Sequence, residues 1–247
     1  MKLDKIVASE AHITDGYNPK VFQWVTDRFI GRTGIILDIG CSSGALGFAL
    51  KERNPNLRVY GVEASYPAFR KAIERLDDVW LIDLSFDLYA LSELLKDLKP
   101  ELVVLADVLE HLKNPEKVLE CIYRNTGPEI TLCVSLPNIF NYELFEKYTS
   151  GVFNYENLGI FDRTHLKFYN VTSAIEMMQQ VGFSSEFEPS FYMLNNKGQD
   201  LFSNHIDAVK CGESLIQIGN VAVKCTSPIR LAELSSYGFM LTCTRSS

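Results

Sequence analysis

The first half of the chain alternates between short apolar runs and amphipathic segments. Five apolar runs of strand length follow one another, at 35–40, 58–65, 79–83, 102–107 and 129–136. Segments with helical periodicity precede and separate them, at 19–30, 44–54, 67–78, 87–98 and 114–125. Because the runs are continuously apolar, each strand is expected to be buried on both faces. The pattern predicts an α/β fold in which a parallel sheet is covered by helices on both sides.

Beyond Pro137 the alternation weakens. A loop-rich segment is expected as far as about residue 170, followed by a helix over 171–183 that Gly182 ends. Two more strands are predicted at 184–191 and 236–245. The intervening insertion, 195–235, has no pattern from which its layout can be predicted.

Composition and charge limit the classes of function. The chain of 247 residues is 47% hydrophobic and 22% charged, which is ordinary for a soluble globular protein. Its net charge is −7 and its pI about 5.2, so no nucleic-acid partner is expected. The longest apolar run is about 102–109, which is too short to span a membrane.

Two further features indicate a cytoplasmic protein. The N-terminal stretch MKLDKIVASEAH lacks the apolar core of a signal peptide. Six cysteines are scattered without a CxxC pair or a zinc-binding spacing. They are therefore interpreted as reduced thiols in the protein core.

A glycine-rich stretch, ILDIGCSSGALG, joins the first predicted strand to the next helix. Such a turn places backbone amides beside a ligand at the carboxyl end of the strand. Neither a phosphate-binding P-loop nor the dinucleotide fingerprint matches, since no lysine follows Gly44 or Gly47 and residue 42 is serine. Asp38, two residues before Gly40, suits a ligand that carries an ammonium group.

Four motifs in order resemble those of class I S-adenosylmethionine-dependent methyltransferases. They are ILDIGCSSG, the acid Glu63 in VYGVEAS, the acid Asp83 in LIDL, and LADVLEHL. The resemblance covers most of the chain. It implies a Rossmann-like sheet of seven strands, mostly parallel with an antiparallel last strand, in one domain.

The resemblance also implies a cofactor site for S-adenosylmethionine, with S-adenosylhomocysteine as product. Asp38 would hold the methionine ammonium, Glu63 the ribose hydroxyls and Asp83 the adenine amino group. The remaining candidates contribute backbone or line the site: Gly40, Cys41, Ser42, Gly44, Ala64, Leu84 and Asp107. In the alternative interpretation, Glu63 and Asp83 are ordinary helix-capping acids.

The acceptor site is predicted from DVLEHL, 107–112, and GIFDRTHLKFYN, 159–170. DRTHLKFY resembles a segment of bacterial methyltransferases of cell-surface sugar and glycoconjugate biosynthesis. This favours a small-molecule hydroxyl as acceptor and His165 as its base, with Glu110 and His111 as further catalytic candidates. Arg163 and Lys167 are available for a phosphate or carboxylate. Alternatively, Arg163 pairs with Asp162 and His165 caps a local turn.

Two other activities remain open. An N-methyltransferase of an amino sugar would use the same cofactor site without needing His165. Asp107, Glu110 and His111 with the distant His165 also resemble the E-x-x-E-H and histidine of metal-dependent methyltransferases that act on quinol precursors or RNA 2′-hydroxyls. Here aspartate replaces the first glutamate, and EHL is also common in metal-free members. A divalent metal is thus an alternative that the sequence does not favour.

The predicted organisation has an N-terminal helical cap (1–30), a cofactor-binding half (31–136) and a substrate-side half (137–247). Tyr17 would either cover the cofactor or pack in the core. Three polar residues of the insertion are expected on a solvated helix face rather than in a lid: His205, Asp207 and Lys210.

Overall fold

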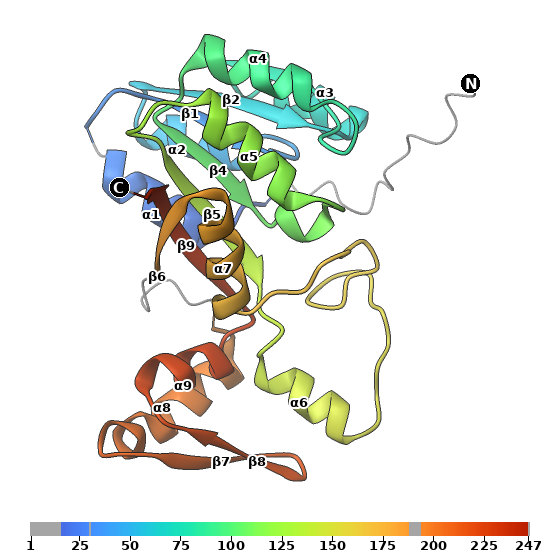
Figure 1. The fold of residues 1–247 in the computed structure, drawn as a ribbon, viewed down its shortest axis with the longest axis vertical. Coiled ribbons are helices and arrows are strands. Elements are labelled where there is room, and N and C mark those ends of the chain that lie inside the picture. Colours follow the sequence, from blue (N-terminus) through green and yellow to red (C-terminus); the bar gives the residue numbers. More distant parts are fainter. Residues whose placement is uncertain (1–15, 30, 188–193, 247) are drawn as a thin grey trace.

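The computed structural model describes residues 16–29, 31–187 and 194–246. Seven strands form one sheet in the order β3-β2-β1-β4-β5-β9-β6, with helices on both faces (Figure 1). Their bounds are β1 Gly34–Ile39, β2 Leu57–Glu63, β3 Asp78–Leu81, β4 Leu102–Ala106, β5 Thr131–Pro137, β6 Phe183–Phe187 and β9 Gly238–Arg245. The first five strands run parallel, and β9 runs antiparallel to β5 and β6. The predicted fold class is confirmed.

Two apolar clusters fill the space on either side of the sheet. One face is covered by α1 Pro19–Phe29, α2 Ala45–Arg53 and α3 Tyr66–Ala72, with Trp24 and Leu50 among the buried residues. The other is covered by α4 Leu88–Leu98, α5 Pro115–Asn125 and α7 Val171–Val181. Both faces of the sheet are therefore buried beneath helices, as the continuously apolar strands predict.

Helix α3 is shorter than the prediction of 67–78. It ends at Ala72, and turns follow it. Leu76 then lies against Gly47 and Gly61, where an added Cβ would meet its side chain at 2.3 Å and 2.8 Å. Beyond the end of the helix, this buried leucine fills the space over the two glycines.

The part of the chain beyond β5 contains structure that the sequence did not reveal. Helix α6, Tyr142–Thr149, lies in the segment predicted to be loop-rich. The insertion is a helix, a hairpin and a helix: α8 Asn196–Lys210, β7 Ser214–Ile218, β8 Val221–Cys225 and α9 Pro228–Ser235. With Tyr142 of α6, these elements enclose a third apolar cluster at the lower end of Figure 1. On α8, Asp207 and Lys210 are exposed as expected, and His205 is half-buried.

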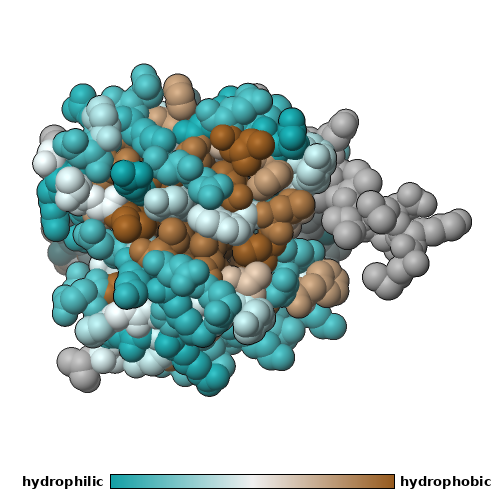
Figure 2. All heavy atoms as spheres, turned by 90° about the horizontal axis from the view of Figure 1, so that it is seen from above, coloured by the Kyte–Doolittle hydropathy of each residue, from teal (hydrophilic) through white to brown (hydrophobic). Residues whose placement is uncertain are grey.

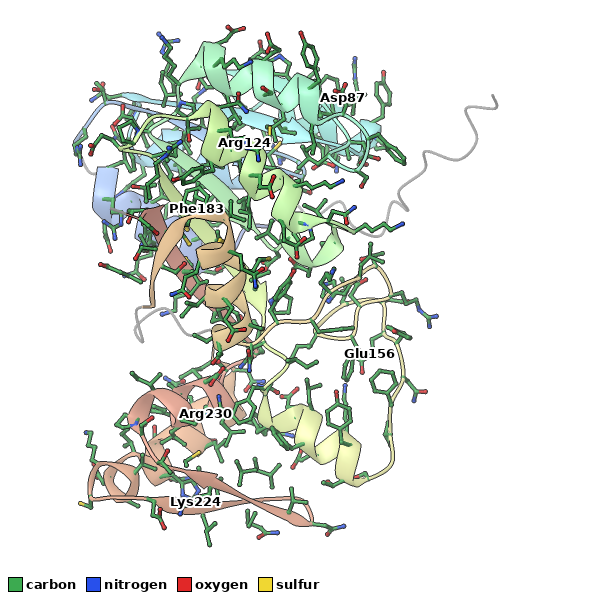
Figure 3. All side chains as sticks on the ribbon, viewed as in Figure 1. Asp87, Arg124, Glu156, Phe183, Lys224 and Arg230 are labelled. Atoms are coloured by element: carbon green, nitrogen blue, oxygen red, sulfur yellow. The ribbon has the colours of Figure 1, made fainter. Side chains whose placement is uncertain are left out.

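Helix α9 is joined to the main domain through Arg230 (Figure 3). Its guanidinium lies 3.6 Å from the centre of the Phe140 ring and forms an ion pair with Glu233. The buried Glu233 also accepts a hydrogen bond from the backbone of Val171, at the start of α7. The buried Glu233 carboxylate thus connects α9, in the insertion, to α7, which covers one face of the sheet.

All six cysteines are unpaired thiols, as predicted. Cys41, Cys133, Cys225 and Cys243 are buried and Cys121 is half-buried. The assignment to the core is wrong for Cys211, because it follows the last turn of α8 at the surface.

Viewed from above, apolar residues gather in the middle of one face and hydrophilic residues surround them (Figure 2). The exposed apolar side chains at this end include Leu81 on the edge strand β3 and Phe86 and Tyr89 near the start of α4. The edge strand β3 has only four residues. No helix in the described ranges is long and apolar enough to cross a membrane.

Candidate functional site

The glycine loop between β1 and α2 depends on two left-handed glycines. Gly40 and Gly44 have φ values of 73° and 75°. A Cβ on Gly40 would meet the Val108 side chain at 2.6 Å, and one on Gly44 would meet the Ala72 backbone at 3.2 Å. Only glycine combines this backbone conformation with such close approach. The loop is therefore held tightly between α3 and the residues that follow β4.

Glu63, at the end of β2, holds the glycine loop from the other side. Its Oε2 accepts a hydrogen bond of 2.8 Å from the backbone of Ser42, a residue with φ of 49°. Its Oε1 accepts from the backbones of Ala64 and Ser65, at 2.9 and 2.7 Å. Glu63 therefore fixes the turn that leads into α3, but it is not the helix cap: the N-cap residue is Ser65, and no side chain among the described residues caps this helix. The capping interpretation is wrong for Glu63, which instead contacts the predicted cofactor loop.

Asp38 is buried in β1 beneath this loop. Its Oδ2 accepts no hydrogen bond from the part of the chain that the structure describes. Burial, and secondarily the nearby charge of Glu63, raise the pKa of the Asp38 carboxyl to about 7. A buried carboxylate with an unused oxygen is costly unless a cation or proton accompanies it. The site thus fits the ammonium group expected from the sequence.

Asp83 and Leu84 follow β3, which lies next to β2 in the sheet. Asp83 Oδ1 accepts a hydrogen bond of 2.9 Å from Ser85, while the Leu84 side chain is buried. Asp87, labelled in Figure 3, rather than Asp83 is the residue that caps α4. Because β1, β2 and β3 are adjacent and parallel, their carboxyl ends bring Asp38, Glu63 and Asp83 to one edge of the sheet.

Asp107 follows β4 in the left-handed conformation, with φ of 54°. Its backbone amide donates to the carbonyl and the hydroxyl of Ser135 on β5. Its carboxyl is hydrogen-bonded by the side chains of Ser135 and Asn18. Asn18 Oδ1 meanwhile accepts from Lys20 at the start of α1. Asn18 is a site residue that was not predicted, although an asparagine before Pro19 is a typical helix cap.

Tyr17 is not packed in the core, so of the two alternatives for this residue, core packing is wrong. Its side chain is 41% exposed and its ring lies 5.1 Å from that of Phe22. Both rings line an open hollow of about 650 Å³ over α2, together with Phe48, Arg53 and Arg75. None of the candidate catalytic residues lines this hollow.

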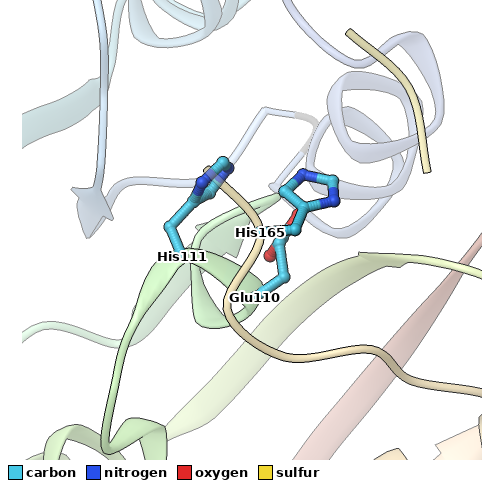
Figure 4. A group of neighbouring side chains, drawn as sticks. All are labelled: Glu110, His111 and His165. Atoms are coloured by element: carbon cyan, nitrogen blue, oxygen red, sulfur yellow. The ribbon is translucent and has the colours of Figure 1, made fainter. Parts of the chain in front are cut away.

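The candidate catalytic residues come from two segments that are far apart in the chain. Glu110 and His111 lie in the short 3-10 helix η3, Leu109–His111, after β4. The carbonyl of Glu110 accepts hydrogen bonds from the backbones of Leu166 and Lys167, at 2.8 and 3.1 Å. These bonds dock the 159–170 loop onto η3. As a result, the His111 and His165 ring centroids are 4.8 Å apart (Figure 4).

The hydrogen bonds of the two imidazoles define their tautomers. His165 Nδ1 lies 2.9 Å from the carbonyl oxygen of Ile160. A carbonyl can only accept, so Nδ1 carries a proton, and in the neutral ring Nε2 presents a lone pair. His111 Nδ1 lies 3.0 Å from Thr164 Oγ1, whose hydroxyl donates to Asp162. His111 Nδ1 therefore donates to Thr164 in turn.

Glu110 is buried beside the two histidines (Figure 4). Neither carboxylate oxygen has a hydrogen-bond partner within 16–29, 31–187 or 194–246. Burial, followed by the charge of Asp107, raises the pKa of Glu110 well above its usual value. One ligand atom from each of Glu110, His111 and His165 lies within 4.8 Å of the others. A carboxylate and two imidazoles at this spacing can hold a proton or a divalent cation.

One part of the alternative interpretation of the 159–170 loop is wrong. Arg163 does not pair with Asp162; its Nε donates to Asn157 Oδ1 at 3.2 Å. Asp162 is buried and accepts from Thr164 instead. His165 does make a local hydrogen bond, and because this bond uses Nδ1, Nε2 is not engaged by it. The supporting role of Thr164 was missed because its sequence position gives no periodic signal.

Comparison with known proteins agrees with this geometry. The sequence profile described as a methyltransferase domain matches residues 16–186. A SAM-dependent methyltransferase from Archaeoglobus fulgidus superposes with a TM-score of 0.57 at 16% identity, covering 92% of this chain and 93% of that one. Magnesium protoporphyrin IX methyltransferase from Synechocystis, solved with bound SAH, gives 0.55 at 14% identity, covering 92% and 81%.

A possible histamine N-methyltransferase from Thermotoga maritima gives a TM-score of 0.53 at 13% identity, covering 96% of this chain and 91% of that one. No curated protein sequence matches the chain. The structural likenesses establish the fold, and the profile match over residues 16–186 establishes the family. The chain belongs to the methyltransferase-domain family.

Proposed function

We propose that this protein transfers a methyl group from S-adenosylmethionine to a hydroxyl of a small-molecule acceptor, a sugar or glycoconjugate intermediate. The single observation that carries the proposal is the orientation of His165 beside Glu110 and His111, at the same strand ends as the glycine loop. The family supplies the reaction type, and the tautomer of His165 supplies the base that a hydroxyl acceptor requires.

The 31–136 half would hold the cofactor. Asp38 would pair with the methionine ammonium, and Glu63 would accept hydrogen bonds from the ribose hydroxyls. Asp83, with the Leu84 backbone, would meet the adenine amino group. The site would be completed by the backbone of Gly40, Cys41, Ser42, Gly44 and Ala64 and by Asp107. When bound, S-adenosylmethionine supplies an activated methyl group on a sulfonium.

His165 would act on the acceptor. Its Nε2 would take the hydroxyl proton while the acceptor oxygen forms a bond to the methyl group and the methyl–sulfur bond breaks. The products would be a methyl ether, an imidazolium and S-adenosylhomocysteine. The Ile160 carbonyl would stabilise the imidazolium by accepting a hydrogen bond from Nδ1. The buried Glu110 carboxyl group, which lies beside the ring, would also stabilise the positive charge. The protein's other contribution is to align the acceptor and exclude water.

A metal-assisted O-methyltransferase is the second candidate, and Glu110 is the observation that favours it. Its two buried, unpartnered oxygens lie beside two imidazoles, which is a donor set suited to a divalent cation. Glu110, His111 and His165 would hold the ion, which would lower the pKa of the acceptor hydroxyl.

The choice of acceptor rests on the resemblance of DRTHLKFY and on two cationic side chains of the 159–170 loop, Arg163 and Lys167. The net charge of −7 disfavours a nucleic-acid acceptor. Six unpaired cysteines support a cytoplasmic location.

The test is a thermal-shift and transfer experiment. S-adenosylhomocysteine at about a hundred times its dissociation constant should stabilise the protein by roughly 2.7 kcal/mol, and NAD should not. Incubation with S-adenosylmethionine labelled in the methyl group should then label hydroxyl-bearing sugar intermediates. Stabilisation by NAD alone, or the absence of a shift with S-adenosylhomocysteine, would contradict the proposal.

A further inference from the structure

The segment next to the candidate acceptor site carries an unusual concentration of exposed apolar side chains. Five of them are between 45% and 65% exposed, and we call them the outer loop surface: Tyr148, Phe153, Tyr155, Leu158 and Leu166. They lie on the end of α6 and on the loop between α6 and α7. Soluble proteins rarely gather exposed apolar groups in this way without a ligand or partner to cover them.

A chain of ring contacts leads from this surface to the catalytic group. The Phe153 ring lies 4.8 Å from that of Phe161, which lies 5.9 Å from Phe168. Phe168 lies 6.5 Å from His165. Phe161 is buried, so this row of rings lies beneath the surface. At the surface itself, the exposed Leu166 directly follows His165 in the chain, so the outer loop surface adjoins the residue that we assign as the base.

The loop is braced so that its apolar side chains stay outside. Lys147 of α6 forms an ion pair with Glu156, which Figure 3 places on the loop. The Glu156 amide donates to the Phe161 carbonyl at 2.8 Å, and the Arg163 amide donates to the Glu156 carbonyl at 3.0 Å. Phe161 already fills the space beneath the loop, being 2% exposed. The outer residues cannot turn inward without displacing it.

We infer that the outer loop surface binds the apolar part of the methyl acceptor, so the acceptor is an amphiphile. Its hydroxyl-bearing head would lie at His165, and its alkyl or aryl tail would cover Phe153, Leu158 and Leu166. The surface adjoins the candidate acceptor site at Leu166, a position that a substrate explains and that a second protein would not require. The inference rests on the proposed function, since it assigns the acceptor class of that same site.

The test compares two glucosides with the same head. Octyl β-D-glucoside, below its micelle concentration, and methyl β-D-glucoside are titrated calorimetrically into the full chain, with and without S-adenosylhomocysteine. The octyl compound should bind at least tenfold more tightly. Leu158→Ser combined with Leu166→Ser should remove most of that difference, and Tyr155→Ser alone should reduce it. The matched control is Leu215→Ser, because Leu215 is 69% exposed but lies on β7.

Equal affinity for the two glucosides, or the same loss in Leu215→Ser, would overturn the inference. Sedimentation with phosphatidylcholine vesicles that the double variant abolishes, without any change in glucoside affinity, would assign the surface to a bilayer and also overturn it. S-adenosylhomocysteine binding should be equal in all variants. Its absence from the wild type would contradict the proposed function, while the contrast between glucosides would still report on the surface.

Discussion

The His111 and His165 imidazoles lie edge to face, with centroids 4.8 Å apart and ring planes at 71°. Two kinds of bond hold their segments together. The backbone carbonyl of Glu110 accepts from the amides of Leu166 and Lys167, and His111 Nδ1 lies 3.0 Å from Thr164 Oγ1. The candidate catalytic group is therefore held partly by main-chain bonds, which substitutions of the Glu110 and His165 side chains leave intact. Variants at Glu110 and His165 should for that reason report on chemistry more than on folding, whereas a His111 variant also loses the bond to Thr164.

His165→Gln should reduce kcat by about 10²–10⁴-fold, because it removes the proposed base. Affinity for S-adenosylhomocysteine should stay within about twofold, since His165 lies on the acceptor side. Steady-state transfer rates and calorimetric titration measure the two quantities. Near-full activity in His165→Gln would favour methylation of an amine, which needs no base once it is neutral.

Glu110→Gln separates the two candidate mechanisms when combined with chelation. If a divalent cation assists, EDTA should abolish turnover of the wild type and added Mg²⁺, Mn²⁺ or Zn²⁺ should restore it, but should not restore it in Glu110→Gln. If His165 acts alone, EDTA should leave the rate unchanged. Atomic-absorption analysis of the purified protein provides an independent readout of bound metal.

Asp38 should make cofactor affinity depend on pH. Its pKa of about 7 means that the carboxylate is half protonated at neutral pH, and the ammonium of S-adenosylhomocysteine binds the ionised form. Affinity should therefore fall below pH 7, approaching tenfold per pH unit, and level off above pH 8. Titration calorimetry between pH 5.5 and 8.5 tests this, and a flat profile would count against Asp38 as the ammonium ligand.

The raised pKa of Asp38 also makes the free energy of unfolding depend on pH. Below the ordinary value near 3.8, Asp38 is protonated in both the folded and the unfolded protein. As the pH rises to about 7, the unfolded protein loses this proton first, so the stabilising contribution of the bound proton is lost. Asp38→Asn should therefore stabilise the ligand-free protein at pH 8 by roughly 2 kcal/mol while weakening S-adenosylhomocysteine binding. Urea unfolding at pH 5 and pH 8 measures the difference, which should shrink at pH 5.

Glu63→Ala should weaken S-adenosylhomocysteine binding by about 10–100-fold, because two charge-assisted hydrogen bonds to the ribose are lost. Glu63→Gln serves as the control, since it keeps one acceptor oxygen and should lose less. If both variants unfold at a lower temperature without any change in ligand affinity, the only function of Glu63 is to fix the turn before α3.

Arg230→Met should destabilise the protein by about 2–4 kcal/mol, because it leaves the buried Glu233 carboxylate without its cation. Arg230→Met combined with Glu233→Gln should recover part of the loss. Chemical denaturation followed by tryptophan fluorescence gives both values. A change below 0.5 kcal/mol in the single variant would show that the ion pair is not needed to hold α9.

Local sequence signals account for most of the sheet and its cofactor edge. Continuously apolar runs predicted β1 to β5, and Gly182 was identified as the end of α7. Helix α6 was missed because its eight residues sit in a stretch without clear periodicity. The layout of the insertion 195–235 could not be predicted, because its apolar residues pack in a small cluster of their own rather than against the main sheet.

The sequence by itself determined the layered α/β fold and placed Asp38, Glu63 and Asp83 near one another, because parallel neighbouring strands end at the same edge. It also singled out Glu110, His111 and His165 by residue type. Only the tertiary structure decided that these three meet, that His165 presents Nε2, and that Asn18 reaches Asp107. Those relationships depend on hydrogen bonds between segments far apart in the chain, and no periodicity or short motif encodes the distance between such segments.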